Sequence, residues 1–109
     1  MPNEAYIGVL LAELRFCDCH SLKGKRKPLS SLRDVMQTRF RVSFSEVAFQ
    51  ETWQRAGVLV TVAASSGRQA RERLDEVERY LHGREWEVGR VLISAAEPVE
   101  ALWDVAFSE

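Results

Sequence analysis

The segment Tyr6–Phe16 constrains the fold more than any other part of the sequence, because its first seven residues are all apolar or glycine. Beyond them the two parities separate: Leu14 and Phe16 stay apolar, whereas Glu13 and Arg15 are charged. Successive side chains of a strand point to opposite faces of the sheet. The pattern therefore predicts a central β-strand whose first half is covered on both faces.

Two other segments repeat apolar residues every three or four positions, which predicts amphipathic helices with one buried stripe each. The second helix opens on Ser66, three residues before Gln69, which is the spacing of a capping box. Gly83 follows it and is the usual helix stop. The expected stripes are Leu29, Leu32, Met36 and Phe40 in the first helix, and Ala70, Leu74, Val77 and Leu81 in the second.

The start of the first helix is ambiguous. Ser21 is a plausible N-cap, but Pro28 would then lie seven residues inside the helix and clash with the carbonyl group of Gly24. Either the helix is kinked at Pro28, or Leu22–Lys27 forms a separate turn and the main helix opens at Pro28. We favour the separate turn, which places the first basic residues on a loop.

Three further segments favour strands: Val42–Phe49, Ala56–Ala64 and Trp86–Ala96. In the first of them the apolar parity changes near Ser45, where we expect a bulge or a twist. The order strand, helix, strand, strand, helix, strand predicts an α+β domain of the ferredoxin-like type. Its sheet would be antiparallel, with both helices on one face. We expect this domain to span residues 1–97.

Residues 98–109 are predicted to form an acidic, amphipathic tail. Within it we expect a short helix over Pro98–Phe107, with the acids on the face opposite the apolar residues. Such a helix would cover the sheet face that the two main helices leave open, or dock on a second subunit of a homodimer. The apolar residues are Val99, Leu102, Trp103 and Ala106.

Composition limits the class of protein. A chain of 109 residues fits one domain with a real core. The longest strongly apolar stretch, Ile7–Ala12, is far shorter than the roughly 20 residues of a membrane span. The N-terminus has no basic residue and does not resemble a secretory signal, and two cysteines suit a reducing compartment. We therefore expect a cytoplasmic protein without membrane contact.

A net charge of −1 conceals an uneven distribution of charge. The segment His20–Arg41 is strongly basic, with Asp34 as its single acid, whereas Glu97–Glu109 carries acids and no base. Clustered cations neutralise phosphates without base-specific contacts. We predict an anion- or RNA-binding surface here; the plainer interpretation is a solvated helix face, or pairing with the acidic tail within a dimer. The candidate residues are Lys23, Lys25, Arg26, Lys27 and Arg33.

RNA binding on the sheet itself is not expected. Domains that bind RNA on an open sheet stack bases on aromatic side chains of the strands. Residues Gly57–Ala63 of the predicted strand Ala56–Ala64 include neither an aromatic nor a basic residue. Any nucleic acid would therefore contact the first helix and the loop before it.

Two motifs resemble those of a known family. Ser21-Leu-Lys-Gly-Lys-Arg26 resembles the first signature of the YlxP-like family of small bacterial proteins of unknown function. Val42-Ser-Phe-Ser-Glu-Val47, followed by Gln50-x-x-Trp53 and Ala56, resembles the second, in the same order and spacing. The resemblance implies a ferredoxin-like fold in a cytoplasmic protein, often encoded among translation and ribosome-maturation genes. Gly24 is a departure, because the family commonly has Glu there, which would complete a capping box from Ser21.

The second motif suggests an alternative function. Glu46, Gln50 and Trp53 are candidate partner-binding residues of a protein–protein adaptor, since exposed tryptophans often anchor interfaces. The plainer interpretation, which we prefer, is that Trp53 packs over the sheet edge or a hairpin end.

Catalysis and metal binding have little support in the sequence. Cys17, Cys19 and His20 are too few ligands for a closed zinc site. They also lack an evident acid or oxyanion loop for a cysteine nucleophile. We predict a non-enzymatic, homodimeric binding module without a cofactor or a small-molecule substrate, whose partner is ribosomal RNA or a ribosome-associated particle.

Overall fold

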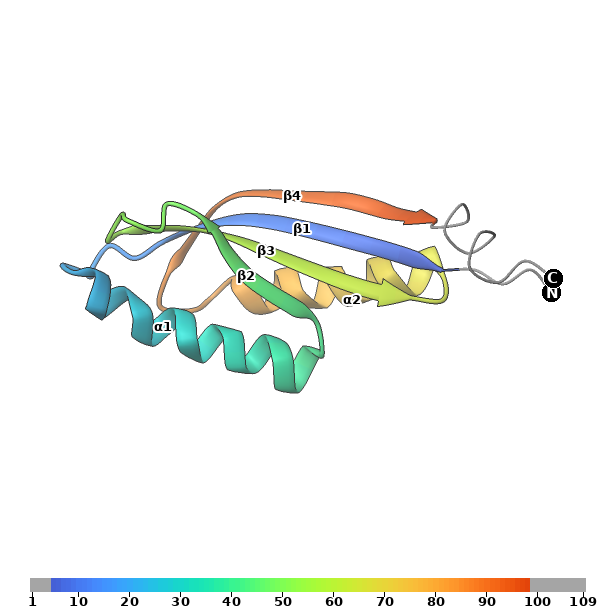
Figure 1. The fold of residues 1–109 in the computed structure, drawn as a ribbon, viewed down its shortest axis with the longest axis horizontal. Helices are drawn as coiled ribbons and strands as arrows, with labels where there is room; N and C mark the ends of the chain where they lie inside the picture. The colour runs from blue at the N-terminus through green and yellow to red at the C-terminus, as the bar shows by residue number, and fades with distance from the viewer. Residues whose placement is uncertain (1–4, 99–109) are drawn as a thin grey trace.

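The computed structural model describes residues 5–98, in the order of elements that the sequence predicts (Figure 1). A short π-helical turn, η1, directly follows the first helix. The residue after it, Arg41, has a left-handed φ of 54°. The elements are β1 (Tyr6–Arg15), α1 (Leu22–Val35), η1 (Met36–Phe40), β2 (Ser43–Ala48), β3 (Arg55–Ala64), α2 (Gly67–Leu81) and β4 (Glu87–Pro98).

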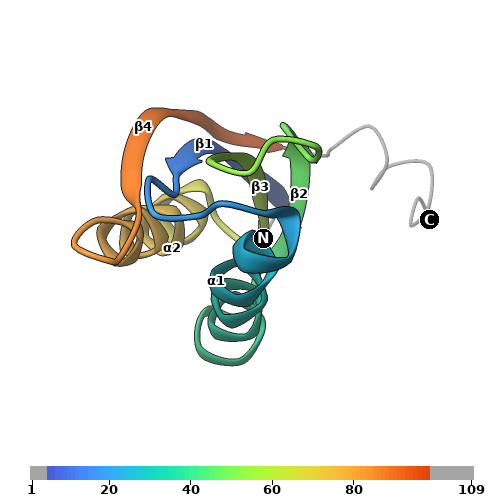
Figure 2. The same cartoon turned by 90° about the vertical axis from the view of Figure 1, so that its left-hand side faces the viewer.

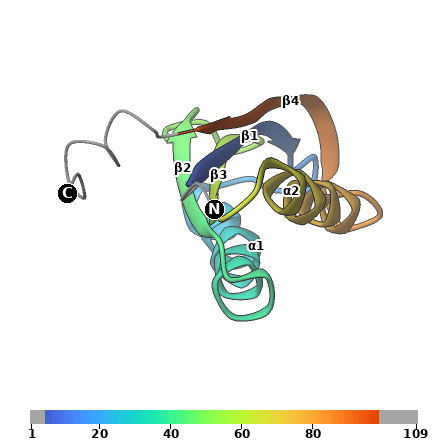
Figure 3. The same cartoon turned by 90° about the vertical axis from the view of Figure 1, so that its right-hand side faces the viewer.

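The four strands form one antiparallel sheet in the order β2-β3-β1-β4. The prediction that β1 is a central strand is confirmed. Figures 2 and 3 show α1 and α2 side by side beneath the sheet, on the same face. The chain is therefore an α+β domain with two helices on one face of the sheet. The prediction that the first half of β1 is covered on both faces stays a prediction, because the described elements cover one face.

The core lies between the sheet and the helices. β1 contributes one parity of its side chains, and β3 contributes its valines. Gly8 allows α2 to approach β1 closely, since a Cβ atom at this position would lie 2.8 Å from Leu74 Cδ1. The buried residues of the sheet are Leu10, Ala12, Leu14, Ala56, Val58, Val60 and Val62; those of the helices are Leu32, Met36, Ala70, Leu74, Val77 and Leu81.

The expectation that the main helix opens at Pro28 is wrong. α1 runs without interruption from Leu22, with Pro28 inside it. Ser21, the N-cap of the alternative that was not favoured, caps the helix: its Oγ accepts a hydrogen bond of 2.9 Å from the amide of Gly24. The cost of an internal proline is offset because the first turn is attached to the sheet by the side chain of Lys25.

The second helix follows its predicted pattern. Ser66 Oγ accepts from the amide of Gln69, and the Gln69 side chain accepts from the amide of Ser65. Gly83, just after α2, has a φ of 75°, which glycine adopts without strain. The bulge expected near Ser45 lies slightly later, between Glu46 and Ala48. Pro98, the first residue of the predicted tail helix Pro98–Phe107, ends β4, and the rest of that segment lies outside the described residues.

Candidate functional site

Lys25 is the only buried charged residue among residues 5–94, with 2% of its surface exposed. Its Nζ donates to Glu46 Oε2 at 2.8 Å and to the carbonyl oxygens of Phe49 and Arg55 at 3.0 Å each. An ammonium group has three N–H donors, and all three are used. We call this arrangement the Lys25 clamp: Lys25, Glu46, Phe49 and Arg55.

The clamp joins the two motifs of the sequence. Lys25 belongs to Ser21–Arg26, and Glu46 belongs to Val42–Val47. The sequence places Lys25 in an anion-binding loop and Glu46 on a partner-binding surface. The structure instead pairs them with each other beneath the β2–β3 connection. Lys25 therefore presents no free N–H group to an anionic partner, and its position is that of a structural anchor.

The connection between β2 and β3 is fixed at several points. Phe49 has a left-handed φ of 61°, and its carbonyl group also accepts from the amide of Thr52. Gln54 Nε2 donates to the carbonyl oxygens of Cys17 and Cys19 at 3.3 Å each. These contacts hold the backbone on both sides of Trp53. The Trp53 residue itself has 51% of its surface exposed. The plainer interpretation, packing over a hairpin end, accounts for only part of this ring.

The other candidates near this connection are accessible. Gln50 is exposed, and His20 lines a shallow hollow with Glu51 and Trp53. Cys17 is exposed and Cys19 half-buried, both as free thiols. Among the described residues, no group of three or more His, Cys, Asp or Glu side chains is arranged to hold a metal ion.

The unbroken helix gathers the remaining basic candidates on one face. At 100° per residue, positions 23, 26, 27 and 33 fall within an arc of about 120°, to one side of the buried stripe, and extend roughly 15 Å along the axis. Among the side chains of residues 5–94 none of the four forms an ion pair with an acid, and the Arg33 guanidinium lies 5.9 Å from the centroid of the Phe44 ring. We call these four exposed residues the α1 basic face: Lys23, Arg26, Lys27 and Arg33.

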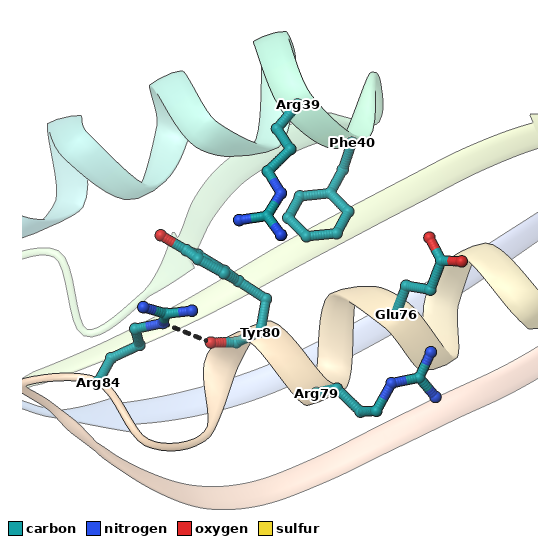
Figure 4. Close-up of a pocket in the computed structure, with 6 residues that line it drawn as sticks. All are labelled: Arg39, Phe40, Glu76, Arg79, Tyr80 and Arg84. Atoms are coloured by element: carbon teal, nitrogen blue, oxygen red, sulfur yellow. Dashed lines mark hydrogen bonds between the residues drawn. The ribbon is translucent and has the colours of Figure 1, made fainter.

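A second basic site was not predicted. Three arginines and one glutamate line a pocket of about 460 Å³ between η1 and α2. Figure 4 shows the Tyr80 ring between the guanidinium groups of Arg39 and Arg84, which lie 5.5 Å and 3.9 Å from its centroid. We call it the arginine pocket: Arg39, Phe40, Glu76, Arg79, Tyr80 and Arg84. Its arginines are up to 45 residues apart in sequence (84 − 39 = 45). The distribution of charge along the chain therefore does not predict that they line one pocket.

An ion pair lies on the sheet face away from the helices. Arg55 Nε donates to Glu13 Oε2 at 2.7 Å, and its Nη2 contacts the same oxygen. The hydrogen bonds from Arg55 lower the pKa of the Glu13 carboxyl group below its ordinary value of 4.5, with a smaller contribution from Arg15. Partial desolvation acts in the opposite direction. Arg55 thus serves both faces: its side chain holds Glu13, and its carbonyl group accepts from Lys25.

Comparisons with known proteins bear on both motifs. Residues 7–95 match the model of a family described as protein of unknown function, DUF503. The chain is 33% identical over 90 residues to "Uncharacterized protein YlxP" of Bacillus subtilis (strain 168), covering 73% of this chain and 98% of the relative. These matches confirm the resemblance to YlxP-like proteins. Every residue of the Lys25 clamp lies inside the matched region, whereas residues 96–109 follow it.

Proposed function

We propose that this chain, which belongs to the DUF503 family, is a non-catalytic cytoplasmic binding module for ribosomal RNA or a ribosome-associated particle. One observation carries the proposal: α1 continues through Pro28 and presents Lys23, Arg26, Lys27 and Arg33 on a single exposed face. We also propose that the fold is ferredoxin-like, because its element order and strand order fit that arrangement.

Electrostatics favours a phosphate-rich partner. Each cation that neutralises a phosphate releases a counterion, so affinity falls as salt rises. The guanidinium and ammonium groups of the α1 basic face are exposed and suit this role, whereas the buried Lys25 does not. We choose ribosomal RNA over other polyanions because the family resemblance implies a protein that is often encoded among translation and ribosome-maturation genes.

The arginine pocket supports the same proposal. Arginine planes and aromatic rings stack on unpaired bases, and this stacking tolerates any sequence. Arg39 and Arg84 flank Tyr80 on the helical side of the molecule, the side on which α1 lies. The arginine pocket would thus offer an unpaired base a stacking site that is separate from the α1 basic face. Arginines near a helix C-terminus also complement the helix dipole, which is their plainer role.

The proposal is tested by the salt dependence of binding to ribosomal RNA fragments. For a single strand, four neutralised phosphates give a slope of about −3 in log K against log salt concentration. Replacing Lys23, Arg26 and Lys27 by Glu is expected to make the slope shallower, with a magnitude of about 1 or below. Lys25 is left unchanged, because its loss would disturb the fold.

A matched control has the same change of charge elsewhere. Replacing Arg68, Arg71 and Arg90 by Glu alters exposed residues outside the α1 basic face. We expect this variant to retain most of the affinity and the slope of the unmodified protein. Equal losses in both variants, or no loss in either, would contradict a specific role of the α1 basic face.

A protein–protein adaptor is the second candidate, favoured by the exposure of Trp53. The ring stands on a loop whose backbone is held by the Lys25 clamp and by Gln54. A rigid, half-exposed tryptophan loses little conformational freedom on binding, which is what interface hot spots require.

A further inference from the structure

The sheet face opposite the helices carries a continuous apolar row. Leu11 of β1 pairs with Leu59 of β3 on one side and with Leu92 of β4 on the other. Leu11 and Leu92 expose 41% and 60% of their surfaces, and Ile7, four residues earlier on β1, exposes 44%. Val9 lies between them and is half-buried. We call this surface the open-face patch: Ile7, Val9, Leu11, Leu59 and Leu92.

Such a patch requires an explanation. Contiguous exposed apolar side chains on a soluble domain mark an interaction site. Its three β1 residues, Ile7, Val9 and Leu11, make the first half of β1 apolar on both parities. This pattern is typical of strands covered on both faces. The helices account for one of these two faces, and the described residues include nothing over the other.

The course of the chain brings a suitable segment to this patch. β4 is an edge strand, and it ends at Pro98, paired with Tyr6, directly beside Ile7. A chain that reverses at this point runs back over β1 from Ile7 towards Leu11. In the sequence that follows, Val99, Leu102, Trp103 and Ala106 share one helical face, and Glu100 and Asp104 share the other.

The dimensions of segment and patch agree. Nine residues of helix, 99–107, would be roughly 14 Å long. The four-residue step from Ile7 to Leu11 spans roughly 13 Å of strand. An isolated helix of this length is marginal in water, so it depends on a surface that buries its apolar stripe.

We propose that residues 99–107 of the same chain form an amphipathic helix that docks on the open-face patch, with the acids directed to solvent. A second copy of the chain is the competing occupant. The segment in cis is favoured because it leaves β4 at the edge of the patch. A short connection gives it a local concentration in the millimolar range, above that of a free partner.

Hydrogen exchange of the full chain tests the docking. The amides of residues 103–107, which are the ones hydrogen-bonded within such a helix, are expected to exchange at least ten-fold more slowly than in an unstructured peptide. Replacing Leu11 and Leu92 by Lys is expected to abolish this protection while the amides of α2 stay protected, which shows that the fold is intact. The control replaces Ser30 and Gln37 by Lys, at exposed positions on α1 and η1 beneath the other face of the sheet, and leaves the tail protected.

Cross-linking decides between one chain and two. In a chain with Cys17→Ser and Cys19→Ser, a short bis-maleimide is applied to Leu11→Cys/Ala106→Cys, with Arg71→Cys/Ala106→Cys as the control. The proposal predicts a link within one chain for the first pair and none for the control. Links between two chains, equal linking in both pairs, or unprotected tail amides would each overturn it.

Discussion

Replacing Lys25 by Met is expected to lower the free energy of unfolding by about 3 kcal/mol. Methionine keeps most of the side-chain volume but removes the three hydrogen bonds of the ammonium group. Losing one partner of a buried ion pair costs about 3–5 kcal/mol. The lower end applies here, because Glu46 is 20% exposed and can be rehydrated, whereas the carbonyl groups of Phe49 and Arg55 lose a charged donor.

Urea unfolding measures this change. With a slope of about 1.5 kcal/mol/M, a loss of 3 kcal/mol lowers the midpoint by about 2 M. Lys27→Met is the matched control, since Lys27 is exposed on the same helix and should change stability by less than about 0.5 kcal/mol.

A double variant separates the ion pair from general packing effects. Lys25→Met/Glu46→Leu removes both charges, so no unpaired carboxylate remains. It is expected to be less destabilised than the sum of the two single variants, with an interaction energy of at least about 1 kcal/mol. Additive single effects, or a Lys25→Met variant as stable as the unmodified protein, would refute the clamp.

Two further predictions concern other residues of the molecule. Arg55→Leu should raise the pKa of Glu13 towards 4.5, as followed by NMR titration of its carboxyl group. Because the folded pKa is lowered, the pair stabilises the fold above pH 4.5 and this contribution is lost as pH falls through the folded pKa; the variant should lose less stability over that range. An unchanged Glu13 titration would contradict this ion pair. Separately, Trp53→Ala should change the free energy of unfolding by less than about 1 kcal/mol, since half of the ring is already exposed. If the chain is an adaptor, the same variant should lose its protein partner in an affinity pull-down; retention of every partner would remove Trp53 from that role.

The fold was largely predictable because it follows local patterns. The stripes Leu32–Met36 and Ala70–Leu81 repeat with the period of a helix, and the strands follow from their apolar runs. Pro28 misled the prediction, because the local rule against internal proline ignores a distant contact. Lys25 reaches oxygen atoms that lie 21 to 30 residues away in the sequence.

The candidate site was less predictable for the same reason. A signal for Lys25 was present: extending the buried stripe of Leu29 and Leu32 back by one turn reaches Lys25. This holds only for a helix that continues through Pro28, so the error about the helix start hid the clamp and placed Lys23, Arg26 and Lys27 on a loop. The arginine pocket had no comparable signal, because Arg39 and Arg84 meet only through the packing of η1 beside α2.

The most direct test of the RNA proposal is to purify the tagged protein from its own cells at low salt, with and without RNase. The account predicts that ribosomal RNA co-purifies with the unmodified protein and with Arg68→Glu/Arg71→Glu/Arg90→Glu. It should be lost from Lys23→Glu/Arg26→Glu/Lys27→Glu. Co-purification of ribosomal RNA that is unaffected by the α1 substitutions would contradict it. So would co-purification of proteins without RNA, in amounts that RNase treatment does not change.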